Sequence, residues 1–191
     1  MKELLGKSVS KHQEAVENSF NESQLAVLES IGKELLKTLK GEHKILLCGN
    51  GGSAADSQHI AAEFVARFKR ERRSLPAMAL TTDTSILTAV ANDYDFQQVF
   101  SRQIEGLGQK GDALIAISTS GKSRNVLEAI RQAKHQGLCT IGFTGGTGGN
   151  MKEMADICFV AQSSDTSHIQ EIHITALHAI SEAIENIFFG A

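Results

Sequence analysis

Short apolar segments recur along the chain from residue 44 onward, and each is followed by a segment with helical spacing. We expect five strands, at 44–48, 76–80, 113–118, 138–143 and 157–160. Short strands that are apolar throughout are typical of a parallel sheet covered on both faces. The alternation of strands and helices therefore predicts an α/β fold, a three-layer sandwich around a central five-stranded parallel sheet with right-handed crossovers.

The first 41 residues lack proline and carry apolar side chains at helical spacing, so we expect one or two amphipathic helices that end at Gly41. Ser53 is expected as the N-cap of the next helix. The length of 191 residues corresponds to about one domain. The prediction is a single domain over 1–191, with 1–41 as N-terminal oligomerisation helices. Further helices are expected at 54–68, 85–107 (two short ones), 124–135, between 150 and 157, and at 167–189.

The net charge is −3, which argues against the basic stripe of a nucleic-acid-binding protein. A short basic cluster comprises Lys69, Arg70, Arg72 and Arg73 and is interrupted by Glu71. We interpret it as a solvated helix end rather than a binding patch, and such a helix end could still help to attract an anionic substrate.

Three cysteines lie in apolar segments without the Cys-x-x-Cys spacing of a metal or redox motif: Cys48, Cys139 and Cys158. They are expected to be buried free thiols, which favours a reducing cytoplasm. We expect neither a membrane span nor a signal peptide, because the apolar segments are short and the N-terminus is polar.

Three turns rich in glycine or serine follow expected strands and should converge at the carboxyl edge of the sheet, at 50–53, 118–123 and 144–150. The second has four hydroxyl side chains in six residues before a helix N-terminus, a combination that favours a phosphate monoester over an ordinary capped turn. Asn50-Gly-Gly-Ser53 makes a weaker case. Neither turn has the P-loop or the Gly-x-Gly-x-x-Gly pattern, which disfavours ATP and NAD.

His59 and Glu63 are four residues apart and share a face of the expected helix. Such a pair can be two metal ligands, part of an acid/base pair, or an exposed helix contact. The last helix carries four more polar side chains among apolar ones, and they indicate either a polar pocket wall or a satisfied core histidine: Gln170, Glu171, His173 and His178.

The sequence resembles sugar isomerase (SIS) domains and, more specifically, the bacterial phosphoheptose isomerases. The resemblance covers nearly the whole chain and rests on these stretches: Leu47-Cys-Gly-Asn-Gly-Gly-Ser53, His59-Ile-Ala-Ala-Glu63, Ala91-Asn-Asp93, Ile117-Ser-Thr-Ser-Gly121 with Ser123, and Ile169-Gln-Glu-Ile-His173 with His178. It implies a flavodoxin-like fold and the conversion of sedoheptulose 7-phosphate to D-glycero-D-manno-heptose 7-phosphate, which feeds heptose synthesis for lipopolysaccharide or other surface glycans.

The resemblance also implies roles for individual residues. Glu63 would be the general base and His178 the general acid. One zinc ion per subunit would be bound by His59, Glu63, Gln170 and His178. The family forms homotetramers with active sites at subunit interfaces. Substrate contacts are implied for Asn50, Gly51, Gly52, Ser53, Asn92, Asp93, Ser118, Thr119, Ser120, Ser123 and Gln170.

Gln170 and His178 would be about 12 Å apart along a straight helix. One ion can reach both only if Gln170 reaches forward and His178 points back, and the alternative is that Gln170 lies in an irregular first turn. Ser167-His168 stands where many family members have Asp-Arg, which bears on sugar specificity.

Two alternatives remain. One is a non-catalytic SIS tetramer that binds the replication initiator, in which we expect the positions of Glu63 and His178 to lack acid/base side chains. The other is a sugar-phosphate-sensing regulator, which would usually carry a DNA-binding domain.

Overall fold

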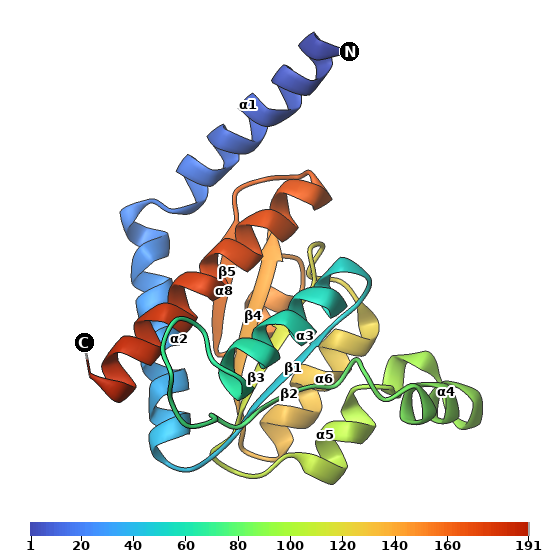
Figure 1. The fold of residues 1–191 in the computed structure, drawn as a ribbon. Coiled ribbons are helices and arrows are strands. Elements are labelled where there is room, and N and C mark those ends of the chain that lie inside the picture. The colour runs from blue at the N-terminus through green and yellow to red at the C-terminus, as the bar shows by residue number, and fades with distance from the viewer. Residues whose placement is uncertain (191) are drawn as a thin grey trace.

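The five predicted strands form one parallel sheet in the computed structural model, which describes residues 1–190. The strands are β1 (Ile45–Gly49), β2 (Ala77–Ala79), β3 (Ala113–Ile117), β4 (Cys139–Gly145) and β5 (Ile157–Ala161). Their order across the sheet is β2-β1-β3-β4-β5, and every neighbouring pair is parallel (Figure 1). This is the flavodoxin-like order, so the predicted fold class is confirmed.

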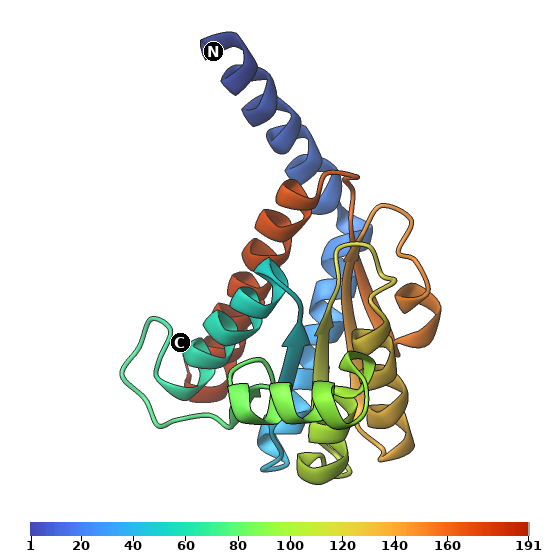
Figure 2. The same ribbon diagram turned by 90° about the vertical axis from the view of Figure 1, so that its right-hand side faces the viewer.

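Side chains alternate across the sheet and fill two separate cores. Ile45 and Leu47 of β1 pack with α2 (Glu22–Lys40), α3 (Gly52–Val65) and α8 (Thr166–Phe189). Leu46 and Cys48 pack on the opposite face. The helices there are α4 (Thr84–Asp93), the 3-10 helix η1 (Phe96–Gln98), α5 (Ser101–Leu107), α6 (Arg124–His135) and α7 (Met151–Met154). Figure 2 shows the sheet edge-on between these two layers.

Two N-terminal helices are present, α1 (Lys2–Ser19) and α2, and they separate where the Asn21 side chain caps α2 by accepting from the Gln24 N–H. α2 packs on the sheet and α8. α1 projects beyond the sheet (Figure 1), and it leaves Leu4, Leu5 and Val9 exposed.

The start of α3 differs from the prediction. Ser53 is not the N-cap: Gly51 occupies that position with φ 55° and offers no side-chain hydrogen bond. Glycine tolerates this left-handed conformation, so the helix begins two residues earlier than expected. Ser53 is buried in the first turn, and its carbonyl accepts from the Ser57 hydroxyl.

α3 ends at Val65 rather than Phe68, so the basic cluster lies in the loop 66–76 and is not a helix end. The Arg72 side chain in this loop is almost fully buried in an ion pair with Glu185. The interpretation of the whole cluster as solvated was therefore wrong for Arg72, whose side chain is buried because it pairs with Glu185 of α8.

The cysteines are free, but Cys48 alone is fully buried, while Cys139 and Cys158 are half-buried. Burial raises the pKa of each thiol, to about 11 for Cys139 and Cys158. Within residues 1–190, no helix combines the length and the apolar character needed to cross a membrane.

Candidate active site

β2 lies on one side of β1, and β3, β4 and β5 follow on the other side. The strand order therefore reverses between β1 and β3, and the turns after these two strands lie side by side. Such a switch point is where α/β proteins bind ligands. Asn50, after β1, and Asn125, at the start of α6, join the two turns: each side-chain amide donates to the other's oxygen, at 2.9 and 2.8 Å. The predicted convergence of 50–53 and 118–123 is therefore present in the structure.

The turn 118–123 presents its hydroxyl groups around the start of α6. The Ser118 and Ser123 hydroxyls lie 2.9 Å apart, and Ser120 Oγ accepts from the Lys122 N–H at 3.2 Å. Ser123 occupies the N-cap position of α6 without a capping hydrogen bond. The free N–H groups of this helix terminus and the nearby hydroxyls are donors suited to a phosphate.

The back of this turn is fixed by the loop that follows β4. The Gly145 N–H donates to the Thr119 carbonyl at 3.0 Å, and the Met151 N–H to the Gly121 carbonyl at 3.1 Å. Gly121 has φ 63°, and a Cβ there would overlap the carbonyl oxygen of Gly148. A side chain at this position would force the turn and the loop apart, so only glycine fits.

A polar cavity of about 260 Å³ opens beside the turn. Hydroxyl-bearing residues dominate its lining, with the Lys122 side chain at one side. The remaining walls come from the end of β4, the loops after β4 and β5, and the start of α8: Gly145, Gly146, Thr147, Ser163, Ser164, Thr166 and Ile169.

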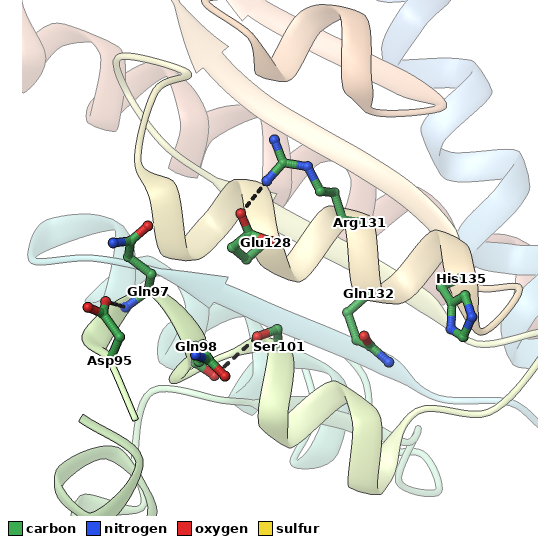
Figure 3. Close-up of a pocket in the computed structure, with 8 residues that line it drawn as sticks. All are labelled: Asp95, Gln97, Gln98, Ser101, Glu128, Arg131, Gln132 and His135. Carbon is green, nitrogen blue, oxygen red and sulfur yellow. Dashed lines mark hydrogen bonds and ion pairs between the residues drawn. The ribbon is translucent and has the colours of Figure 1, made fainter. Parts of the chain in front are cut away.

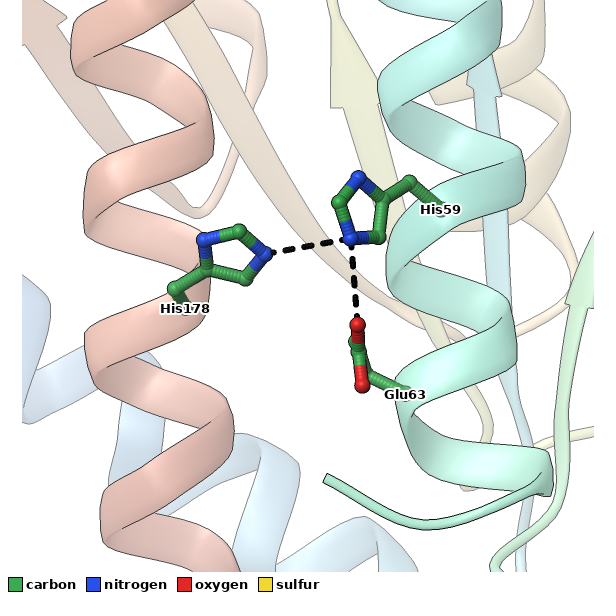
Figure 4. Close-up of side chains that lie close together, drawn as sticks. All are labelled: His59, Glu63 and His178. Atoms are coloured by element: carbon green, nitrogen blue, oxygen red, sulfur yellow. Dashed lines mark hydrogen bonds and ion pairs between the residues drawn. The ribbon is translucent and has the colours of Figure 1, made fainter. Parts of the chain in front are cut away.

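His59, Glu63 and His178 form one cluster across α3 and α8 (Figure 4). His59 Nε2 lies 3.0 Å from Glu63 Oε1 and 3.3 Å from His178 Nε2. One ligand atom from each residue lies within 4.8 Å of the others. The His59 side chain is about half exposed, at 49%, so a solvent-borne ligand can reach the cluster.

Burial lowers the pKa of His178, and the neighbouring His59 lowers it further, while Glu63 acts in the opposite direction. His178 is therefore held toward the neutral imidazole, the form that binds metals. Asp56, one turn before His59, is a neighbour that sequence reasoning missed. Burial raises its pKa to about 6, and its buried Oδ2 has no hydrogen-bond partner. Its spacing of three residues from His59 was the available signal.

Gln170 is placed at the other end of this helix pair. α8 is regular from Thr166 onward, so the alternative of an irregular first turn at Gln170 is not formed. The Gln170 amide packs on Gly52, where a Cβ would overlap it. The structure thus brings three of the four expected metal ligands together and directs Gln170 to the turn at 50–53.

The other polar side chains of α8 do not form a pocket wall. His173 is fully buried, and its Nε2 lies 2.9 Å from the Thr144 carbonyl, so it is a core histidine. Burial lowers its pKa to about 4. Glu171 pairs with His12 of α1 at 3.0 Å, and His168 is buried against the His12 ring.

Asn92 and Asp93 lie exposed in the last turn of α4, where the Asn92 amide donates to the Asp93 carboxylate at 2.8 Å. Figure 1 shows α4 at the periphery, apart from α3 and α8. A second polar cavity, of about 590 Å³, lies between α6 and the η1–α5 segment (Figure 3). Its lining contains none of the predicted site residues: Asp95, Gln97, Gln98, Ser101, Glu128, Arg131, Gln132 and His135.

Comparison with known proteins matches residues 10–145 to the SIS domain. The chain is 51% identical over 188 residues to a phosphoheptose isomerase of a Nitratiruptor species, covering 98% of this chain and 100% of the relative. The structure of a phosphoheptose isomerase from Neisseria gonorrhoeae superposes with a TM-score of 0.92 at 39% identity, covering 97% of this chain and 98% of that one. For the enzyme from Francisella tularensis the TM-score is 0.93 at 33% identity, with 96% and 97% covered.

The chain belongs to the SIS domain family. Within that family it belongs with the phosphoheptose isomerases, and it is a sugar-phosphate isomerase. The comparisons give no support to the alternative of a non-catalytic tetramer that binds the replication initiator.

Proposed function

We propose that this enzyme converts sedoheptulose 7-phosphate to D-glycero-D-manno-heptose 7-phosphate in the cytoplasm, supplying heptose for lipopolysaccharide or other surface glycans. The observation that carries the proposal is the pairing of a phosphate-type turn with the His59–Glu63–His178 cluster on one side of the fold. The phosphoheptose isomerase names of the relatives support the choice of sugar.

The spacing of the two parts suits an extended sugar. Gly52 begins α3 at the strand edge, and His59 follows seven residues later, about 10 Å along the helix axis. An open seven-carbon chain can span this length of α3. Its phosphate would then lie near the turns that Asn50 and Asn125 join, with its carbonyl end at the cluster.

The chemistry needs one base and one acid. Moving the carbonyl between C1 and C2 removes a proton from one carbon and returns it to the other. Glu63 would act as the general base that takes the proton from C1 and returns it to C2. His178 would donate a proton to the carbonyl oxygen at C2 and regain one from the C1 hydroxyl as the new carbonyl forms. Positioned acid/base groups of this kind contribute about 10²–10⁴-fold to a rate.

The cluster also fits a zinc ion, one per subunit, with His59, Glu63 and His178 as ligands and Gln170 as the fourth expected from the resemblance. Two nitrogens bound at about 2.0–2.1 Å to a tetrahedral ion lie roughly 3.3 Å apart, and His59 Nε2 and His178 Nε2 are 3.3 Å apart. Bound there, zinc would polarise the substrate's carbonyl and hydroxyl oxygens.

Substrate contacts are proposed at the two strand-end turns and on α4, in a homotetramer whose active sites lie at subunit interfaces. An interface at each site would explain how Asn92 and Asp93, at the periphery of one chain, could contribute to binding. The contact residues would be Asn50, Gly51, Gly52, Ser53, Asn92, Asp93, Ser118, Thr119, Ser120, Ser123 and Gln170.

The proposal is tested by incubating the purified protein with sedoheptulose 7-phosphate and following formation of the aldose by NMR. Fructose 6-phosphate, one carbon shorter, serves as the matched control for chain length. We expect turnover of the heptulose and little or none of the hexulose. Turnover of fructose 6-phosphate alone would contradict the proposed substrate.

A further inference from the structure

The loop 66–76 closes back on α8 through one buried carboxylate. Glu185 accepts hydrogen bonds from three successive backbone N–H groups, those of Phe68 at 3.1 Å, Lys69 at 2.8 Å and Arg70 at 3.1 Å. Burial raises the pKa of Glu185, but the bonds from Lys69 and Arg72 outweigh that effect and hold the pKa below its usual range. Glu185 is therefore a charged tether for the loop.

Arg72 pairs with this carboxylate and reaches the end of α3. Its Nε donates to Glu185 Oε1 at 2.9 Å, and the two side chains are only 2% and 3% exposed. Its Nη1 donates to the Phe64 carbonyl at 2.8 Å, and its Nη2 donates to the Glu63 carbonyl at 2.6 Å. The guanidinium thus satisfies carbonyls in the last turn of α3, the turn that carries the Glu63 side chain.

The same loop places an aromatic ring against the cluster. The Phe68 ring stacks on the His178 imidazole, with centroids 5.6 Å apart and planes 26° apart. The other ring beside His178 is that of His59, whose centroid lies 4.9 Å away in an edge-on arrangement. His178 therefore contacts two rings, and the backbone N–H of Phe68 is one of those bound by Glu185.

We propose that Arg72 and Glu185 are positioning residues for the isomerase reaction, acting on Glu63 through its backbone carbonyl and on His178 through the stacked ring of Phe68. The inference rests on the proposed function, because it assumes that Glu63 and His178 are the groups that transfer protons. It also gives Arg72 a role other than attracting the substrate. The Arg72 side chain has almost no exposed surface with which to attract an anion.

The loop and α8 also share an exposed ion pair, which provides an internal control. Lys69 Nζ lies 2.7 Å from Glu182 Oε1, with side chains 58% and 45% exposed. Glu182→Gln removes the charge of this exposed pair and leaves the Glu185–Arg72 pair in place. The Lys69 ammonium lies 5.6 Å from the centre of the Phe68 ring, so this variant also measures what that cation contributes. Exposed pairs of this kind contribute little to a fold because water screens them.

The test measures kcat and KM for sedoheptulose 7-phosphate in wild type, Phe68→Leu, Phe68→Tyr, Glu185→Gln and Glu182→Gln. Displacement of a reacting group by a distant substitution can cost up to about 10²-fold in rate. We expect kcat to fall by about 10- to 100-fold in Phe68→Leu and Glu185→Gln, with KM within about threefold of wild type. Phe68→Tyr, which keeps the ring, should restore most of the rate, and Glu182→Gln should match wild type.

Glu185→Gln leaves a buried guanidinium without its counter-charge and can fail to fold, so Phe68→Leu decides the question in that case. Its circular dichroism spectrum should match that of wild type. A folded Phe68→Leu with wild-type kcat would overturn the inference, and so would equal losses in Phe68→Leu and Phe68→Tyr. A wild type that isomerises no sugar phosphate would overturn the proposed function, and this inference with it.

Discussion

His59 Nε2 and His178 Nε2 lie 3.3 Å apart, although the two residues are separated by 119 positions in the sequence. Two imidazole nitrogens at this distance need either a proton or a cation between them. Glu63 Oε1 lies 3.0 Å from the same His59 nitrogen. Two nitrogens and a carboxylate oxygen are a donor set that zinc prefers.

We therefore expect one zinc ion per chain in protein purified without chelators, measured by elemental analysis. His59→Ala should reduce the bound metal to a small fraction, because it removes the atom shared by both close contacts. His135→Ala, on the exposed end of α6, is the matched control and should retain the ion. Absence of stoichiometric metal from wild type would count against the site, and full activity after metal removal would confine the ion to a structural role.

The turn 118–123 should supply most of the phosphate affinity. Ser118→Ala with Ser120→Ala should weaken sugar-phosphate binding by a few kcal/mol, since each hydrogen bond to a charged group is worth about 1.5–3 kcal/mol. Isothermal titration calorimetry measures this loss. Ser30→Ala, on the exposed face of α2, is the control and should bind as wild type does. Unchanged affinity in the double variant would place the phosphate elsewhere.

His173 should make the stability of the protein depend on pH. Its pKa falls from 6.5 to about 4 on folding, because burial disfavours the imidazolium. The unfolded chain therefore binds the proton first as the pH falls. The contribution of the neutral His173 ring to the free energy of unfolding is fully present above pH 6.5. It is lost as the pH falls toward 4, by on the order of 3 kcal/mol in total.

Asp56 has a raised pKa, so its protonation stabilises the folded protein as the pH falls over much of this range. The quantity to measure is therefore the difference in pH-dependent stability between wild type and a His173 variant. Urea unfolding of wild type and His173→Gln at about pH 7 and about pH 5 gives it. The loss of stability between the two pH values should be smaller in the variant than in wild type, and His135→Gln should behave as wild type. Equal losses in wild type and His173→Gln would show that His173 is not buried as a neutral ring.

The N-terminal helices should mediate assembly into a tetramer. An apolar groove of about 330 Å³ lies between α2 and α8, and Leu25 and Ile187 at its margins are 51% and 62% exposed. Leu25→Glu combined with Ile187→Glu should dissociate the assembly, because two charges would be buried without partners. Light scattering should return a tetramer mass for wild type and a smaller mass for the variant. A monomer mass for wild type at micromolar concentration would contradict the prediction.

The strands could be predicted because each is a short apolar segment between polar turns, and the convergence of the turns at 50–53 and 118–123 follows from parallel topology. The start of α3 could not, because the preference of Ser53 for an N-cap competes with the left-handed φ available to Gly51. The His59–Glu63 pair could be predicted from helical spacing. Its contact with His178 depended on the resemblance, since no local pattern determines which faces of α3 and α8 meet.

The environment of the loop 66–76 lies beyond local sequence patterns for a different reason. Arg72 and Glu185 are 113 residues apart, and each carries a charge that by itself predicts a place on the surface. The Glu185 carboxylate accepts from three backbone N–H groups of the loop, and the Arg72 guanidinium donates to the carbonyls of Glu63 and Phe64, the second of which also accepts from the Leu75 N–H. These polar backbone groups come together only in the folded tertiary structure.

The role of Glu63 is the central claim, and proton exchange at C1 of the substrate tests it most directly. Wild type and Glu63→Gln are each incubated with sedoheptulose 7-phosphate in D₂O, and deuterium at C1 is followed by NMR while bound zinc is measured. Gln keeps the size of Glu but cannot accept a proton from carbon. We predict rapid deuteration by wild type and a rate at least about 10²-fold lower in Glu63→Gln. Near-wild-type deuteration by Glu63→Gln would contradict the assignment of Glu63 as the base, whereas loss of zinc in parallel with deuteration, restored by added zinc, would make Glu63 a metal ligand only.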